Sequence, residues 1–287
     1  MIYLILAIVF SSGVFMAMRF FKRFDLDNNQ ALMWNYVFAT GTGFLMCIQF
    51  DTFPVLVGEE WFGLSLLTGF WFIFTYLLMT VSTQSSGVTI TSLSSKLSVV
   101  LPTLAGVLLF QEKLGLQVTI GIILALVALV LVVGGGNKSA SGTQRTNWVL
   151  PILIFFGTGT GDILMKLNEQ RNAADDMSFM IAFIYLIAML FGVILVSYDL
   201  IRGISKWQNK SIVGGVALGV INFFSTYFIF HAMRCFDNVV LFPVYNIGVV
   251  CLTALIGWLL FKEKLTWKNY LGLAFAIIAV VLITVSL

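Results

Sequence analysis

One lysine, Lys96, lies deep inside an apolar segment, within the sequence Thr-Ile-Thr-Ser-Leu-Ser-Ser-Lys-Leu-Ser at residues 89–98. On an α-helix Ser92 and Lys96 share one face because they are four residues apart, and Ser95 broadens that face. An ammonium group surrounded by hydroxyls suits a carboxylate or phosphate on a bound molecule, or it exchanges a proton with its surroundings. These three residues are therefore predicted to line a binding site.

Asp162 is an acidic residue that can neutralise Lys96, because it also lies inside an apolar segment. It is four residues before Lys166, however, and side chains at that spacing also meet on a helix. The sequence alone does not decide whether Asp162 pairs with Lys96 or with Lys166. A pair of Lys96 and Asp162 with a purely structural role is the remaining interpretation. We favour a binding role for Lys96 and leave that of Asp162 open.

Four further polar residues within or beside apolar segments complete the candidate site. Tyr245 and Asn246 offer hydrogen bonds and aromatic surface, and Asn222 lies well inside its segment. His231 is the only histidine of the chain. It can titrate near neutral pH and couple a process to protons, whereas the alternative is a solvated histidine near the membrane surface.

The elements that carry these residues are predicted to be membrane-spanning helices. Hydrophobic residues make up 60% of the 287 residues, charged residues make up 10%, and the mean hydropathy is +1.01. The apolar runs are about 20 residues long, which is the length that a helix needs to cross a bilayer, and they lack the alternation of barrel strands. We therefore predict an all-α polytopic membrane protein. Its ten predicted spans are 2–21, 31–50, 61–81, 87–110, 116–133, 147–167, 177–197, 212–232, 238–261 and 267–286.

The distribution of basic residues predicts the orientation of these spans. In alternate connections and the adjacent span ends, 11 of the 16 Lys and Arg residues lie on one side and four on the other, and basic loops favour the cytoplasm. Both termini are thus expected on the extracytoplasmic side, in the inner membrane of a bacterium. The 11 residues are Arg19, Lys22, Arg23, Lys138, Arg145, Arg202, Lys206, Lys210, Lys262, Lys264 and Lys268.

Composition argues against several functional classes. A net charge of +3 does not suggest nucleic-acid binding. Cys47, Cys235 and Cys251 lack the spacing of metal ligands, and they are interpreted as small buried apolar residues. One histidine, three scattered cysteines and few acids inside the spans leave almost nothing from which to assemble a catalytic set. We expect neither an enzyme nor a metal or other cofactor.

A repeat relates the two halves of the chain. A shift of 151 residues aligns Thr75–Val132 with Thr226–Ile283 without a gap, and Leu-Leu-Phe-Gln-Glu-Lys-Leu meets Leu-Leu-Phe-Lys-Glu-Lys-Leu. Five spans in each half would give the halves opposite orientations, that is, an inverted repeat. The predicted division is 1–135 for the first repeat, 136–146 for a linker and 147–287 for the second repeat.

The two halves differ at the candidate site. Lys96 aligns with Ile247, and Ser94 and Ser95 align with Tyr245 and Asn246. A symmetric scaffold with a divergent lining suits an asymmetric bound molecule, whereas drift after duplication is the alternative.

Ten spans in two halves, each with Phe-x-Glu-Lys-Leu closing its fourth span, resemble the drug/metabolite transporter superfamily and its EamA-type members. The resemblance covers nearly the whole chain and implies transport without naming the transported molecule. It also implies that Glu112, Lys113, Glu263 and Lys264 belong to the scaffold, as interfacial charges that end a span.

These observations together predict a secondary transporter that works by alternating access. Its expected substrate is a small polar metabolite, anionic or zwitterionic, such as an amino acid. The other partners considered are the lipid bilayer, a proton as coupling ion and a second copy in a homodimer. The alternatives are an exporter of lipid-linked sugars or drugs with the same fold, or a membrane protein that does not transport.

Overall fold

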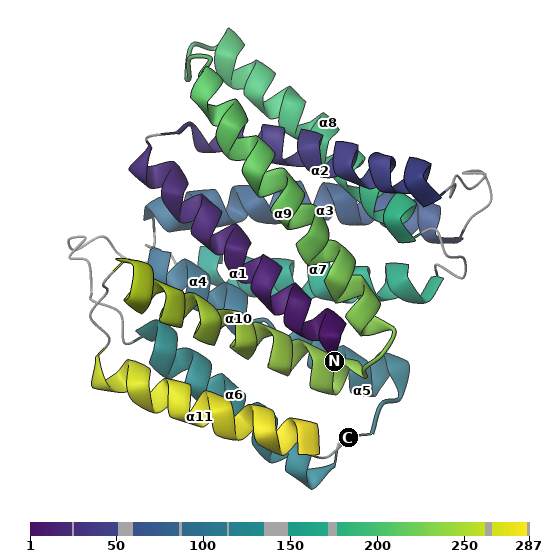
Figure 1. Cartoon of the computed structure of the whole chain (residues 1–287), viewed down its shortest axis with the longest axis vertical. Coiled ribbons are helices and arrows are strands. Elements are labelled where there is room, and N and C mark those ends of the chain that lie inside the picture. Colours follow the sequence, from purple (N-terminus) through teal and green to yellow (C-terminus); the bar gives the residue numbers. More distant parts are fainter. Residues whose placement is uncertain are drawn as a thin grey trace. The chain divides into compact units, whose positions relative to one another are not determined.

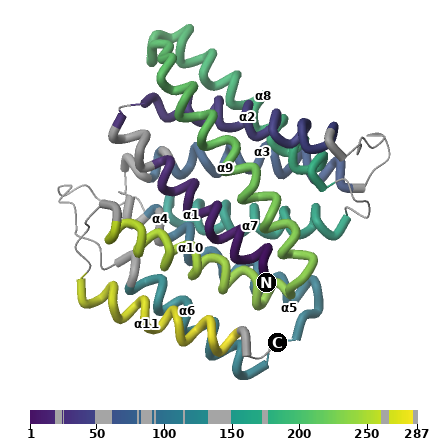
Figure 2. Tube along the Cα trace, in the orientation of Figure 1, coloured from purple at the N-terminus to yellow at the C-terminus, as the bar shows by residue number. Residues whose placement is uncertain are grey.

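The computed structural model describes residues 1–24, 26–50, 60–85, 88–113, 115–134, 149–171, 177–261 and 266–285, and every regular element within them is an α-helix. Figures 1 and 2 show the course of these helices. Each predicted span coincides with one helix, except the fourth, which is divided in two. The helices are α1 (Ile2–Arg23), α2 (Asn28–Phe50), α3 (Glu60–Ser85), α4 (Val88–Leu97), α5 (Val100–Phe110), α6 (Leu116–Gly134), α7 (Val149–Arg171), α8 (Met177–Ile201), α9 (Asn209–Met233), α10 (Asn238–Phe261) and α11 (Trp267–Val285).

The helices have the length and composition of membrane spans. Within the described residues, six of them are long and apolar enough to cross a bilayer, namely α2, α3, α7, α8, α9 and α10. Shorter apolar stretches lie in α1, α6 and α11, and one runs from α4 into α5. Because a helix satisfies its own backbone hydrogen bonds, such segments are stable in lipid. The predicted all-α membrane protein is confirmed at this level, while the inversion of the repeat stays a prediction.

The interruption between α4 and α5 falls at Ser98 and Val99. Pro102 has no N–H group to donate to the carbonyl of Ser98, four residues earlier, and its ring crowds that carbonyl. That carbonyl accepts from the N–H of Leu101 at 2.9 Å instead, and Val99 N–H donates to the carbonyl of Lys96 at 3.4 Å. Both bonds span three residues, which tightens the helix and ends it. The single span predicted at 87–110 is therefore two helices in the structure.

Packing groups the helices into two compact units. Unit 1 comprises Met1–Phe74 and Leu164–Arg234, and unit 2 comprises Thr75–Ile163 and Cys235–Leu287. In unit 1, α9 packs against α1 and α2, and α2 packs against α8. In unit 2, α11 packs against α6, and α10 packs against α5 and α6. Each unit therefore takes helices from both halves of the sequence, and the predicted boundaries of the two repeats stay a prediction.

Unit 2 has a centre of small side chains. Four buried alanines of α6 and α11 pack together with Ile247 of α10. Alanine allows helix backbones to approach closely, which favours association inside a membrane. Ile247, the repeat counterpart of Lys96, is 1% exposed. Equivalent positions of the two halves thus hold an apolar packing residue and a cation. The alanines are Ala125, Ala128, Ala276 and Ala279.

The Phe-x-Glu-Lys-Leu motif after α5 connects this helix to the beginning of α10. Gln111 has a left-handed backbone with φ of 56°, and its N–H bonds to the carbonyl of Gly106, as does that of Glu112. Oε2 of Glu112 accepts the N–H of Val239 at 2.9 Å, in the first turn of α10. A carboxylate there satisfies a helix donor and complements the helix dipole. This contact agrees with the scaffold role that the resemblance implies for Glu112; Glu263 lies outside the described residues.

In unit 1, two glycines let α9 approach α2 closely. A Cβ atom at Gly219 would lie 2.5 Å from the carbonyl oxygen of Asn35, and a Cβ at Gly215 would lie 2.9 Å from the carbonyl oxygen of Ala31. The neighbouring atoms belong to the helix backbone, which cannot move aside as the end of a flexible side chain can. Glycine at these positions therefore sets the distance between the helices.

We expect Gly219→Ala to destabilise the protein by about 1–3 kcal/mol, the usual cost of an overpacked contact. The measurement is thermal unfolding of the purified protein in detergent. Gly41→Ala is the matched control on α2, because a Cβ at Gly41 meets nothing within 4 Å and alanine favours the helix. Equal unfolding temperatures for the two variants would contradict the tight contact.

Candidate functional site

Unit 2 brings together three of the predicted site residues: Lys96 on α4, Asp162 on α7 and Asn246 on α10. Nζ of Lys96 donates to Oδ1 of Asn246 at 3.4 Å. The Asp162 carboxylate lies near enough to the Lys96 ammonium to interact with it electrostatically. Lys96 and Asp162 are half-buried, and Asn246 is buried. A cation, an anion and an amide therefore meet within helices that carry the apolar sequence of membrane spans.

The amide of Asn246 is held in place by its own helix. Its Nδ2 donates to the carbonyl of Phe242, one turn earlier on α10, at 3.1 Å. The amide thus uses a donor on the backbone and directs its acceptor, Oδ1, to Lys96. A fixed acceptor of this kind orients the ammonium group without neutralising it.

Three further predicted residues lie on α4 and α10. Ser95 is half-buried on α4, and its carbonyl accepts the hydroxyl of Ser98 at 2.6 Å. Tyr245 is half-buried on α10, next to Asn246. The side chain of Ser92 lies outside the described residues. The roles of Ser92, Ser95 and Tyr245 in binding stay predictions.

Asn222 belongs to unit 1, where it takes part in a different polar cluster. Its Nδ2 donates to Oδ1 of Asn35 on α2 at 3.2 Å, and its carbonyl accepts the hydroxyl of Tyr185 on α8 at 3.2 Å. Tyr185 also lies 2.5 Å from the hydroxyl of Thr226. Asn222 thus joins three helices of unit 1, and its role in substrate binding stays a prediction.

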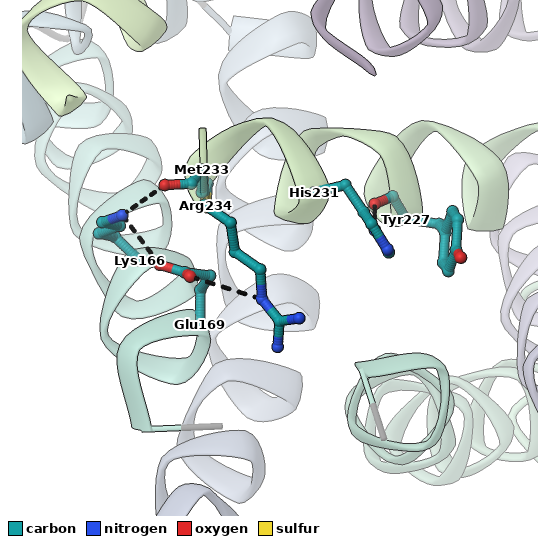
Figure 3. Close-up of polar contacts among 6 residues, drawn as sticks. All are labelled: Lys166, Glu169, Tyr227, His231, Met233 and Arg234. Carbon is teal, nitrogen blue, oxygen red and sulfur yellow. Dashed lines mark hydrogen bonds and ion pairs between the residues drawn. The ribbon is translucent and has the colours of Figure 1, made fainter. Parts of the chain in front are cut away.

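His231 lies near the end of α9 between two aromatic rings. Its ring centroid is 4.2 Å from that of Tyr227 and 5.1 Å from that of Tyr3 on α1. Nδ1 lies 2.9 Å from the carbonyl of Tyr227 (Figure 3), which favours the tautomer with the proton on Nδ1. The ring is half-buried rather than fully solvated. Its proposed part in proton coupling stays a prediction.

A charged cluster at the end of α7 was not predicted as a unit. Figure 3 shows Glu169 between Lys166 and Arg234. Nζ of Lys166 lies 2.8 Å from Oε2 of Glu169 and donates to the carbonyl of Met233 at 2.7 Å, while Nε of Arg234 lies 3.8 Å from Oε1 of Glu169. The side chains of Lys166 and Glu169 are each 9% exposed. These contacts give Lys166 its own acidic partner, which favours Lys96 as the partner of Asp162.

The sequence contained one signal for this cluster. Lys166 and Glu169 are three residues apart, a spacing at which helical side chains meet. The contact with Met233 joins residues 67 positions apart, and no local pattern indicates it. The same applies to Asn168, which bonds to Ser65 and Thr68 of α3 at 2.8 and 2.7 Å.

Comparisons with known proteins cover the whole length of the chain. It is 29% identical over 286 residues to an uncharacterized protein of Haemophilus influenzae, covering 96% of this chain and 95% of that one. A protein crystal structure has the same fold, with a TM-score of 0.80 at 12% identity, covering 99% of this chain and 96% of the other. The model of the EamA-like transporter family matches residues 1–134 and again residues 146–285. The chain therefore belongs to the EamA-like transporter family, within the drug/metabolite transporter superfamily.

Proposed function

We propose that this protein is a secondary transporter that carries a small anionic or zwitterionic metabolite, such as an amino acid, across the bacterial inner membrane. Membership of the EamA-like family supports transport of small molecules across a membrane. The observation that carries the finer proposal is the position of Lys96 on α4, beside Asn246 and within the electrostatic reach of Asp162. Charged groups inside membrane spans are costly, and they commonly mark a substrate or ion pathway.

The chemistry of these three side chains suits a substrate with two opposite charges. An ammonium group binds a carboxylate or a phosphate as a compact point charge. When Lys96 interacts with the substrate's anionic group, its attraction to Asp162 is weakened. A cationic group on the same substrate can then interact with Asp162 and compensate for that loss. Asn246 supplies an oriented acceptor beside Lys96. A zwitterion thus leaves fewer buried charges without a partner than a simple anion does.

The sequence repeat supports an alternating-access mechanism. Halves that share a fold but enter the membrane in opposite directions can exchange conformations, so that a site opens first to one side and then to the other. The pairing of Lys96 with Ile247 across the repeat gives such a carrier an asymmetric site, because only one half supplies the cation. We propose that this asymmetry fixes the orientation of the substrate in the site, with its anionic group toward Lys96.

Counterflow in proteoliposomes tests the proposal. Proteoliposomes that contain the purified protein are loaded with one unlabelled compound, and the uptake of the labelled form of the same compound is measured. Amino acids, organic acids, phosphate esters and neutral sugars are compared in this way. We expect saturable counterflow for a zwitterionic or anionic compound and none for neutral sugars. A protein shown to be folded that exchanges only neutral compounds, or that gives a flux without saturation, would contradict the proposal.

A further inference from the structure

Unit 1 contains an apolar groove between α1 and α9, which lie side by side in Figure 1. The groove has a volume of about 750 Å³, within the range of cavities that enclose small molecules. Small residues form much of its two walls: Gly13 and Ala17 on α1, and Gly214 and Ala217 on α9. Their spacings of three and four residues place each pair on one helix face. These small residues leave space beside the larger lining residues, such as Met16 and Ile221.

The groove combines this apolar wall with a cation at one end. Among the described residues that line it, Lys210 in the first turn of α9 is the charged one, and its Nζ donates to the carbonyl of Phe24 just after α1 at 3.1 Å. A bond to a carbonyl does not neutralise the charge of an ammonium group, so this end of the groove carries a cation. A long apolar wall with a cation at its end has the chemistry that recognises an anionic amphiphile.

The segments around this end of the groove are basic. Residues 19–27 and 199–210 together contain six Lys or Arg residues and three Asp residues. Two of the three acidic residues are engaged within the protein: Asp27 accepts the N–H of Gln30, and Asp199 accepts an N–H from Asn29. The basic excess lies on the side that the charge distribution assigns to the cytoplasm, where the leaflet is rich in anionic lipids.

We propose that the groove between α1 and α9 binds an acyl chain of an anionic phospholipid, with the phosphate of the headgroup at Lys210. One wall, α9, is a candidate membrane span, and the other, α1, carries a shorter apolar stretch, so acyl chains are the apolar molecules available to the groove at high concentration. A polar metabolite would gain nothing from walls that offer it almost no hydrogen bonds. The charge at Lys210 selects anionic headgroups over zwitterionic ones. This site involves none of the residues proposed to bind the substrate, so it stands or falls independently of transport.

Native mass spectrometry of the delipidated protein tests the site, with phosphatidylglycerol and phosphatidylcholine as probes. We expect phosphatidylglycerol to bind more tightly, and Lys210→Gln to weaken its binding about five-fold, as one basic residue near a lipid surface contributes. Ala217→Phe should fill the groove and reduce binding at least about ten-fold. Ala217 is exposed on α9, so the larger side chain does not enter the protein core.

Val220→Phe is the matched control, because Val220 is 37% exposed on the same helix but does not line the groove. It should bind phosphatidylglycerol as the unchanged protein does. Equal binding by the Ala217→Phe and Val220→Phe variants would overturn the groove as the site. Equal affinity for the two lipids, unaffected by Lys210→Gln, would overturn the headgroup contact. A dimer that disappears in the Ala217→Phe variant, without lipid binding in either protein, would assign the groove to a second copy instead.

Discussion

Lys96→Met is expected to reduce the initial rate of counterflow at least about 30-fold. The substitution removes the cation proposed to bind the substrate's anionic group and leaves the Asp162 carboxylate in an apolar surrounding without its partner. Losing one member of a charge pair in an apolar surrounding costs about 2–5 kcal/mol, which corresponds to a factor of about 30 to several thousand. Lys113→Met is the matched control, because Lys113 is exposed after α5. We expect this variant to transport normally.

The double variant Lys96→Met/Asp162→Asn separates binding from structure. It removes both charges, so the protein should regain most of the stability lost in the single variant. Transport should nevertheless remain absent, because no cation faces the substrate. A double variant that transports at the normal rate would show that the two charges only stabilise each other, and it would contradict the proposed role of Lys96.

Glu169→Gln is expected to destabilise the protein by about 3–5 kcal/mol. Glu169 is the carboxylate shared by Lys166 and Arg234 (Figure 3), and an amide would leave the buried ammonium of Lys166 with the Met233 carbonyl and no counter-charge from Glu169. Thermal unfolding in detergent measures the effect. Arg171→Gln, which removes an exposed charge at the same end of α7, should change stability little.

A second substitution tests whether the unpaired charge is the cause. In Lys166→Met/Glu169→Gln the buried cation is removed together with its partner, so this double variant should be more stable than Glu169→Gln alone. If the double variant is instead less stable by the sum of the two single effects, the ion pair does not account for the loss. Packing of the side chains would then be the explanation.

The spans were predictable because their signal is local. A run of apolar residues about as long as the bilayer is thick is sufficient to predict a helix, and α10 begins and ends where its span was predicted, at Asn238 and Phe261. The interruption at Ser98 was less predictable. A proline changes the backbone one turn before its own position, and whether the result is a kink or a break depends on the contacts that the freed carbonyl finds.

The candidate site was predictable only where each residue had one plausible partner. Lys96 was selected by its position inside an apolar segment and Asn246 through the repeat, and the structure brings them together. The sequence could not choose between Lys96 and Lys166 as the partner of Asp162, because both pairings satisfy simple spacing or burial arguments. The choice depends on Glu169, three residues after Lys166, and on the end of α9, which approaches Lys166 only after folding.

Lys96 lies in the last turn of α4, and this position affects how its charge is tolerated in a membrane. Aligned peptide dipoles leave a partial negative charge at the C-terminal end of a helix, which favours a nearby cation by about 0.3–2 kcal/mol. Lys166 uses the same arrangement when it donates to the carbonyl of Met233, the last residue of α9. An unbroken fourth span would offer Lys96 no such helix end. The division into α4 and α5 therefore provides part of the solvation that water would give to an exposed lysine.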